Sequence, residues 1–355
     1  MLIQHTDLKT LVNSIFIAAG SSDKEADSIA RHLVEANLVG HDSHGVIRVA
    51  QYIGWIREGK AFLNKHAVII NESDTFAVLD GQFGFGQVIG EEAVALGIKK
   101  AHQHGISVIG LRNAGHLGRI GDWAVMAAEA GLVSVHFVNS NGFAILAAPY
   151  GGTDRRLSSN PISVGVPTSG AFPLILDMAT CSVSEGKIMV AKNAGKKLPD
   201  GLIIDGKGQP TNDPNVFYAN PPGAILPLSP GYKGYGLSFM CELLAGALTG
   251  GDTSSPKSPT AGRMANGMLS IYLDQTRFSR QEGFIAEIEK LTDWVKTSPK
   301  AEPKGEILLP GELEYCTKED RMKNGISLDE TTAQQLLDAA KSVGVDAALT
   351  NPLVS

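Results

Sequence analysis

The sequence predicts an α/β fold in which a mixed sheet is flanked by helices and preceded by a helical N-terminal unit. The first 55 or so residues carry apolar side chains at helical spacing. From residue 67 onward, strand-like and helix-like segments alternate along the chain. The chain has 355 residues, of which 43% are hydrophobic and 19% charged, so it can bury a large core in about two domains.

The N-terminal unit is predicted to cover residues 1–72. Apolar spacing predicts helices over 6–20, 23–40 and 44–55. A further helix is predicted from Leu328 onward, and this segment, 328–355, is expected to pack back on the N-terminal unit.

The α/β core is predicted over residues 73–327 and contains most of the expected strands. Segments with strand character are 66–73, 75–81, 106–114, 132–140, 162–167, 173–177 and 307–311. Segments with helical character are 91–105, 122–131 and 233–250. Turn residues concentrate in 195–223, 253–260 and 293–305. Strands that alternate with helices in this way predict a parallel or mixed sheet covered by helices.

Composition argues against several classes of partner. The formal net charge is −6, which disfavours binding to nucleic acid or to an anionic membrane surface. The three cysteines, Cys181, Cys241 and Cys316, are far apart and lack a CxxC pair. No disulfide framework is therefore predicted, and a reducing, cytoplasmic location is expected. We expect neither a secretory signal nor a membrane-spanning segment, since no long apolar run occurs.

Histidines are distributed unevenly, because all nine lie before residue 137. Any chemistry that uses an imidazole must draw it from this part of the chain. His41 and His44 have the HxxH spacing of a metal pair, but no third cluster of ligands accompanies them. No metal site is predicted.

The stretch HDSHGVIRVAQYI (41–53) carries the strongest local signal. Helical spacing would place His44, Arg48 and Tyr52 on one helix face, with Asp42 or Ser43 as the cap. An arginine offers the forked donors that a carboxylate accepts, and a nearby imidazole can exchange a proton. We therefore predict a substrate site here. The alternative is a capped helix with exposed polar side chains.

Polar, glycine-rich segments also follow the buried strands. NAGHLGRIG (113–121) places His116 at the end of one strand, and VNSNG (138–142) ends the next, where α/β proteins bind ligands. PGYKGYGLS (230–238) could seat an anion at a helix start, although it lacks the spacing of a P-loop. GFGQVIG (84–90) has the spacing GxGxxxG, with no acid at the expected distance. We interpret it as a tight turn and a glycine-packed helix start, not a Rossmann fingerprint.

Eight such segments occur in an order that resembles a known family. They are DSHGVIR, RNAGHLGRIG, VNSN, SNPISVGVP, LDMATCSVSEGK, PTNDP, GYKGYGLS and ILLPGE, collinear from about residue 5 to 345. The set is similar to the malate/L-lactate dehydrogenase family, which is unrelated to the Rossmann dehydrogenases and also includes sulfolactate and ureidoglycolate dehydrogenases. The resemblance implies a non-Rossmann, family-specific NAD(P)-binding fold with NAD or NADP as cofactor. It also implies a homodimer with the site near the subunit and domain interface.

The resemblance also implies roles for individual residues. Ser43 and His44 match the family's Ser–His pair, Arg48 its carboxylate-binding arginine, and His116 a histidine beside the nicotinamide. The positions that match the cofactor-binding residues are His116, Leu117, Gly118, Ser140, Asn160, Leu176, Asp177, Met178, Lys233, Gly234, Pro310, Gly311 and Glu312.

The predicted function is therefore an NAD(P)-dependent 2-hydroxy-acid dehydrogenase (EC 1.1.1.-) with a malate- or lactate-like substrate. His44 is the first choice as acid/base and His116 is its competitor. One alternative is an NAD(P)H-dependent reductase of a cyclic α-imino acid. Another is a Ser–His hydrolase built on Ser43 and His44, disfavoured because adjacent residues rarely face each other and no GxSxG motif occurs. A third is a non-catalytic ligand-binding protein.

Overall fold

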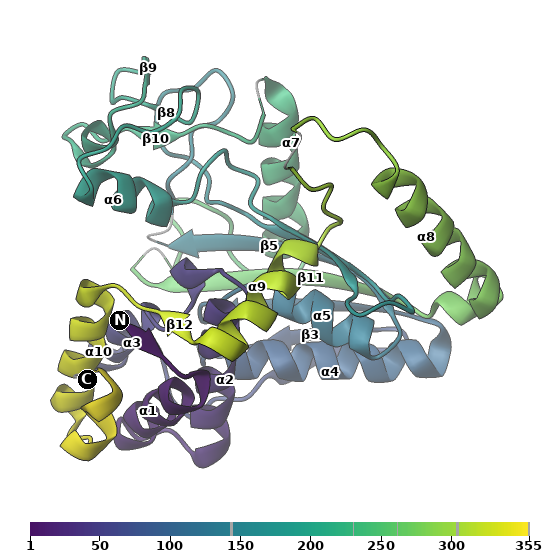
Figure 1. The fold of residues 1–355 in the computed structure, drawn as a ribbon, viewed down its shortest axis with the longest axis horizontal. Coiled ribbons are helices and arrows are strands. Elements are labelled where there is room, and N and C mark those ends of the chain that lie inside the picture. The colour runs from purple at the N-terminus through teal and green to yellow at the C-terminus, as the bar shows by residue number, and fades with distance from the viewer. Residues whose placement is uncertain (143–144, 230, 261, 303–304, 354–355) are drawn as a thin grey trace.

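The computed structural model describes residues 1–142, 145–229, 231–260, 262–302 and 305–353. Its core is a seven-stranded sheet with the order β2-β3-β4-β11-β5-β6-β7 (Figure 1). Strands β3 and β4 pair in parallel, and the other neighbouring pairs of the described sheet are antiparallel. The prediction of a mixed sheet flanked by helices is confirmed. The strands are β2 Val68–Glu72, β3 Phe76–Asp80, β4 Ile106–Ala114, β5 Val133–Gly142, β6 Ile162–Val166, β7 Leu174–Met178 and β11 Met264–Leu273.

Helices cover both faces of this sheet (Figure 1). On one face lie α4 (Gly86–His104) and α5 (Gly121–Glu129), and a Cβ on Gly97 of α4 would come within 2.3 Å of the Tyr272 ring of β11. On the other face lie α7 (Tyr232–Cys241) and a π-helix, η3 (Glu242–Ala247). The predicted helix 233–250 thus ends its α-helical part at Cys241. Short π-helical segments are often found at functional sites.

Strand β11 lies at the centre of the sheet and was not predicted from the sequence. It pairs antiparallel with both β4 and β5, so these two strands run parallel without touching. The run contains Asn266 and Gly267, two residue types that strands disfavour. The register against β4 shifts between Asn266 and Met268, which marks a bulge. Because β11 is buried on both faces, its sequence lacks the alternation of polar and apolar residues by which a strand is predicted.

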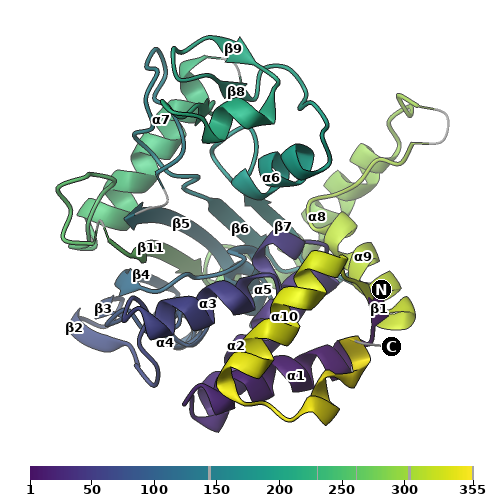
Figure 2. The same ribbon diagram turned by 90° about the vertical axis from the view of Figure 1, so that its left-hand side faces the viewer.

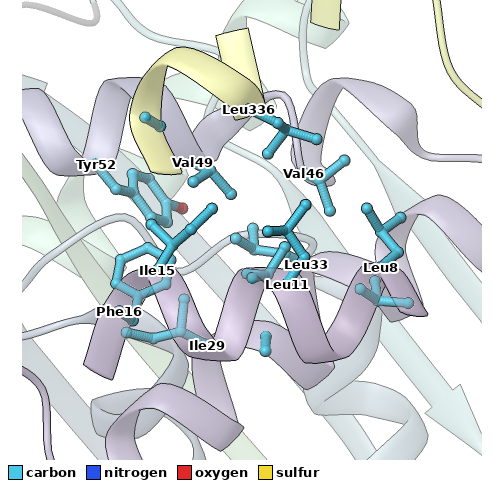
Figure 3. Close-up of a cluster of buried hydrophobic side chains, with 14 of the residues drawn as sticks. Leu8, Leu11, Ile15, Phe16, Ile29, Leu33, Val46, Val49, Tyr52 and Leu336 are labelled. Carbon is cyan, nitrogen blue, oxygen red and sulfur yellow. The ribbon is translucent and has the colours of Figure 1, made fainter. Parts of the chain in front are cut away.

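The N-terminal helices α1 (His5–Ala18), α2 (Asp23–Leu38) and α3 (Arg48–Arg57) share a hydrophobic cluster with α10 (Glu330–Val343). Figure 3 shows this cluster, in which Leu8, Leu11, Ile15 and Leu33 pack beneath Leu336. Figure 2 shows α10 beside α1, and α10 packs against α1 and α3. Strands β1 (Leu2–Ile3) and β12 (Ile326–Ser327) pair beside it. The domain division at residues 72 and 73 stays a prediction.

The remaining elements lie away from the sheet centre. A small lobe contains α6 (Glu185–Asn193), the short helix η2 (Pro214–Tyr218) and the strands β8 Ile203–Ile204, β9 Pro210–Thr211 and β10 Ala224–Ile225. Helix α8 (Gln281–Lys296) stands apart from the body of the molecule (Figure 1), and α9 (Glu312–Asn324) returns to it. The predicted loop 293–305 therefore begins later, because α8 continues to Lys296.

One predicted strand, 307–311, is wrong. Its Leu309 amide donates to the Glu312 side chain, and Pro310 offers only its carbonyl, which accepts from the Ile175 amide of β7 at 3.1 Å. A single bond of this kind does not make a ladder. Parts of three predicted segments lie outside the described residues, namely residue 230 of 230–238, residues 303–304 of 293–305 and residues 354–355 of 328–355.

Candidate active site

The loop before α3 holds two of the predicted catalytic residues. Residues Asp42–His44 form a 3-10 turn, Gly45 is extended, and α3 begins only at Arg48. The Asn37 side chain fastens this turn by donating to Asp42 at 2.6 Å and accepting from the Val46 amide at 2.8 Å. A Cβ on Gly45 would lie 2.2 Å from Asn37 Oδ1. The expected single helix face is therefore wrong, since His44 precedes α3 and neither Asp42 nor Ser43 caps it.

Arg48 is held against this turn. Its Nε donates to the Ser43 carbonyl at 2.7 Å, and its Nη1 donates to Gln51 Oε1 at 2.9 Å. The side chain is half-buried, and among the residues that the structure describes no hydrogen bond engages Nη2. The Ser43 hydroxyl lies 3.0 Å from His44 Nδ1. The expectation that these adjacent side chains would not face each other is wrong, because the tight turn brings them together.

His116 lies in the loop that follows β4, directly above the GFG turn. The Gly115 amide donates to the Gly84 carbonyl at 2.8 Å. A Cβ on Gly86 would lie 2.2 Å from the His116 carbonyl oxygen, so only a glycine allows this approach. The interpretation of GFGQVIG as a tight turn and a glycine-packed helix start is confirmed.

The structure brings the two candidate acid/base residues together. The rings of His44 and His116 stack with centroids 5.8 Å apart. Burial and the Arg48 guanidinium lower the pKa of His44 to about 3. Burial, Arg48 and His44 lower the pKa of His116 well below its usual value. Both imidazoles are therefore neutral at pH 7 in the ligand-free protein.

Tyr52, predicted to bind substrate, is directed at His116. Its hydroxyl lies 2.7 Å from His116 Nδ1 and also accepts from Gln87 Nε2 at 3.1 Å. The side chain is only 1% exposed. The hydrogen bond to Tyr52 occupies Nδ1 and leaves Nε2 as the ring nitrogen available to a ligand. A role for Tyr52 in substrate binding stays a prediction.

Three of the predicted cofactor positions meet around Asn266 of β11. The Leu117 amide donates to Asn266 Oδ1 at 2.9 Å, and Asn266 Nδ2 donates to the Ser140 hydroxyl at 2.7 Å. The Ser140 amide in turn donates to Asn160 Oδ1 at 3.2 Å. Asn266 thus joins the loop of His116 and Gly118 to β5, and Asn160 joins β5 to the segment that precedes β6. Asn160 continues to the π-helix through a 2.8 Å hydrogen bond to Glu242.

Asp177 of β7 anchors the other side of the His116 loop. Its Oδ2 accepts from the Gly121 amide at 2.9 Å and lies 3.6 Å from Arg119 Nε. Burial raises the pKa of Asp177, although Arg119 opposes this shift. Arg119 also donates to Asp122 at 2.8 Å, and Asp122 meets His32 at 2.9 Å. A buried chain of charges therefore runs from β7 to helix α2.

The other predicted cofactor positions border β7 and α7. Leu176 and Met178 flank Asp177 in β7, and the Leu176 side chain is 41% exposed. The turn Pro310–Glu312 is attached to β7 through the Ile175 amide, and Gly311 has φ +87°. The Glu312 carboxylate is engaged by the Leu309 amide and Lys296.

Lys233 is exposed in the first turn of α7. Gly234 is packed so closely that a Cβ would lie 1.9 Å from the Leu228 carbonyl oxygen. Within the described part of the chain, no hydrogen bond or ion pair links Lys233 to the other predicted site residues.

Comparison with known proteins identifies the family. A family model for malate/L-lactate dehydrogenase matches residues 3–337. The chain belongs to the malate/L-lactate dehydrogenase family. Hydroxycarboxylate dehydrogenase B of Escherichia coli (strain K12) is 42% identical over 342 residues, which cover 95% of this chain and 93% of that protein.

Two solved structures of the malate/L-lactate dehydrogenase family resemble this one throughout. Sulfolactate dehydrogenase from Methanocaldococcus jannaschii has a TM-score of 0.88 at 33% identity, covering 98% of both chains. Malate dehydrogenase from Pyrococcus horikoshii also has a TM-score of 0.88 at 33% identity, covering 98% of this chain and 96% of that one. The resemblance inferred from the eight sequence segments is confirmed.

Several polar residues of this family member were missed by sequence reasoning. Gln87 stands inside a motif that we interpreted only as a turn, and Asn266 stands in the strand that was not predicted. His32 and Asp122 carry no motif. His136 is a satisfied core residue, because Ser270 and Ser134 contact its two ring nitrogens. Among the residues that the structure describes, no group of three or more His, Cys, Asp or Glu could hold a metal ion.

Proposed function

We propose that the protein is an NAD(P)-dependent dehydrogenase that interconverts a 2-hydroxy acid and its 2-oxo acid (EC 1.1.1.-). One observation carries this proposal, namely the stack of His44 on His116 beside the half-buried Arg48. Relatives named for hydroxycarboxylate, malate and sulfolactate act on acids of this class, which supports it.

Arg48 binds the substrate carboxylate in this proposal. The Ser43 carbonyl and Gln51 hold its guanidinium from one side, so the group is oriented before the substrate arrives. A carboxylate on the Nη2 side would form charge-assisted hydrogen bonds, which are about twice as strong as neutral ones. The bound carboxylate would also offset the charge that lowers the pKa of both histidines, and so would raise their pKa toward neutrality.

The proton on the substrate oxygen is exchanged by an imidazole. We assign this role to His116, because a fully buried chain of Tyr52 and Gln87 fixes its Nδ1. The Nδ1 of His44 instead meets the partly exposed Ser43 hydroxyl. A neutral imidazole accepts the hydroxyl proton during oxidation, and its protonated form returns a proton during reduction.

The predicted cofactor positions fit a nicotinamide dinucleotide. Lys233 offers an exposed cation for phosphate, the end of β5 offers polar groups at Ser140, and Leu176 offers apolar surface for a flat ring. When bound, the nicotinamide supplies the hydride chemistry, and the protein supplies orientation and proton management. Comparison of turnover with NADH and NADPH distinguishes NAD from NADP as the cofactor.

A Ser–His hydrolase fits the geometry less well. The Ser43 hydroxyl does meet His44 at 3.0 Å. However, no GxSxG motif surrounds Ser43, so the strand-to-helix turn that exposes a nucleophilic serine in such hydrolases is not present in the sequence.

We also propose that the enzyme is a cytoplasmic homodimer. Helix α7 and the segment after it expose the apolar side chains Tyr232, Phe239, Met240, Leu243 and Leu248, a surface that a second copy could bury. The three cysteines are unpaired, which suits a reducing compartment. Separately, the described helices include none that is both long and apolar enough to cross a bilayer. Light scattering coupled to size exclusion measures the oligomeric state, and a monomer at micromolar concentration would contradict the dimer.

The decisive experiment measures oxidation of NADH and NADPH with a panel of substrates. The panel contains pyruvate, oxaloacetate, sulfopyruvate and a cyclic α-imino acid. Turnover of a 2-oxo acid is expected, whereas turnover of the imine alone would favour the reductase alternative. Quenching or enhancement of NADH fluorescence provides an independent binding measurement. If the protein neither binds nor turns over NADH or NADPH, the proposed function is contradicted.

A further inference from the structure

Gln87 lies in the first turn of α4, directly behind Tyr52. Its side chain is fully buried, and its Nε2 donates to the Tyr52 hydroxyl at 3.1 Å. Its Oε1 is also buried but has no hydrogen-bond partner among the described residues. A buried amide oxygen without a partner costs about 1–3 kcal/mol, so its retention here requires an explanation.

The two orientations of the Gln87 amide are nearly equivalent in the protein. Rotation by 180° about the last side-chain bond exchanges Oε1 and Nε2. Either orientation places one amide atom on Tyr52 and leaves the other without a partner in the same buried position. The direction of the amide is therefore free to follow the hydrogen bond that Tyr52 makes with His116.

The Tyr52 hydroxyl has a single hydrogen to share between Gln87 and His116. When Gln87 donates to Tyr52, this hydrogen points at His116 Nδ1, and the neutral imidazole carries its own hydrogen on Nε2. That tautomer has no lone pair on Nε2 to accept a substrate proton. When Gln87 presents Oε1, Tyr52 donates to it and accepts from His116 Nδ1–H, which leaves the lone pair on Nε2.

We propose that Gln87 is a positioning residue that selects the tautomer of His116 through Tyr52. With its carbonyl toward Tyr52, the chain His116 Nδ1–H, Tyr52 O–H and Gln87 Oε1 keeps Nε2 as the nitrogen that exchanges the substrate proton. In the oxidation direction the hydroxyl proton moves to Nε2, and Nδ1 keeps its hydrogen throughout. No hydrogen bond of the chain reverses during the step.

Two further features support this assignment. Burial raises the pKa of Tyr52 to about 12, so Tyr52 keeps its proton and serves as a fixed link in the chain. A protonated imidazole has a hydrogen on both nitrogens, so it must donate to Tyr52, and the Tyr52 hydrogen then turns to Gln87. The charged and titratable groups that face His116 are Arg48, His44, Tyr52 and Lys60, which lines the same small pocket.

The experiment compares Gln87→Met with Gln87→Glu. Methionine keeps the volume but cannot accept from Tyr52, whereas glutamate differs from glutamine by one atom and accepts through a carboxylate. Selective ¹⁵N labelling of the histidine rings reports the tautomer of His116 by NMR without substrate. We expect the proton on Nδ1 in the wild type and in Gln87→Glu, and on Nε2 in Gln87→Met.

Kinetics provide the second measurement. Gln87→Met should lower kcat by about tenfold to a hundredfold, with the KM for the dinucleotide unchanged. Gln87→Glu should retain most of this activity and move the pH limb of the reaction upward, because an added negative charge favours the protonated imidazole. Gln275→Met, a second buried amide far from the site, is the matched control and should change neither measurement.

The results separate this proposal from the proposed function, on which it rests. An unchanged His116 tautomer and an unmoved pH limb in both Gln87 variants would overturn it, even in an active dehydrogenase. A tautomer change in a protein without dehydrogenase activity would overturn the proposed function and leave the chain intact. If Gln87→Met does not fold, Gln87→Leu takes its place in the tautomer measurement, because leucine likewise cannot accept a hydrogen bond from Tyr52.

Discussion

The ring of His44 lies nearly parallel to the ring of His116, at an angle of 13°, although 72 positions of the chain separate the two residues. At a centroid distance of 5.8 Å, two protonated imidazoles would repel each other strongly. The pair can therefore carry one proton at a time, as an acid/base site requires.

Replacement of each histidine by asparagine should separate their roles. We expect His116→Asn to lower kcat by about 10²- to 10⁴-fold, because it removes the proton acceptor. His44→Asn should lower kcat less, since His44 stacks on His116 but does not exchange the proton in this assignment. Saturating turnover with the best substrate of the panel measures both effects, and His104→Asn at the end of α4 is the control. A larger loss in His44→Asn would reverse the assignment.

Arg48→Gln should weaken the binding of the substrate far more than that of the dinucleotide. Loss of a charge-assisted pair at a partly buried site costs about 2–5 kcal/mol, or roughly 30- to several-thousand-fold in kcat/KM. The exposed Arg156, paired with Asp154, provides the control Arg156→Gln. Isothermal titration with the dinucleotide should be unaffected. An unchanged KM for the acid would show that Arg48 does not bind the carboxylate.

The pH dependence of the two reaction directions should differ. In the free protein the pKa of His116 lies well below 6.5, so the imidazole stays neutral above that pH. Oxidation needs the neutral form, and its kcat/KM should be level from about pH 6.5 upward and fall only at lower pH. Reduction needs the protonated form, and its kcat/KM should fall about tenfold per pH unit above the pKa. An acid limb for oxidation near pH 8 would contradict this assignment.

His32 should make the free energy of unfolding decrease as the pH rises above neutrality. Burial opposes its charge, but Asp122 and Glu91 prevail and raise its pKa to about 9, against 6.5 in the unfolded chain. The folded protein therefore binds the extra proton between these values. The stabilisation is complete below about pH 6.5 and is lost as the pH rises through 9.

Urea denaturation at pH 6.5, 8 and 9.5 measures this effect, which should amount to roughly 2–3 kcal/mol. The variant His32→Asn should lose that part of the pH dependence while keeping the contributions of all other groups. Equal pH dependence of the wild type and the variant would show that the ion pairs of His32 do not stabilise the fold.

The candidate site could be predicted from the sequence because its signals are local. Glycines beside His116, and a serine, a histidine and an arginine within six residues, predict ligand contacts without any knowledge of the tertiary fold. The partners of these residues are different, because Asn266 and Gln87 become neighbours of the site only through tertiary packing. No spacing rule connects residue 266 to residue 117, and a glutamine at a helix start is ordinary until Tyr52 is placed against it.

The error at His44 has a similar cause. Spacings of four residues predicted one helix face, but they say nothing of Asn37, whose side chain bends the chain at Gly45. The displaced turn is what lets Arg48 reach back to the Ser43 carbonyl.

The central position of β11 has a consequence for folding during synthesis. A nascent chain emerging from the ribosome exposes the facing edges of β4 and β5 until residue 273 has been made, since β11 supplies the partner of both. The N-terminal amine gains its hydrogen-bond partner later still, because it donates to the carbonyl of Leu328. The central sheet can therefore close only after residue 273 of the 355-residue chain has been made, and until then two strand edges stay open to pairing with other chains.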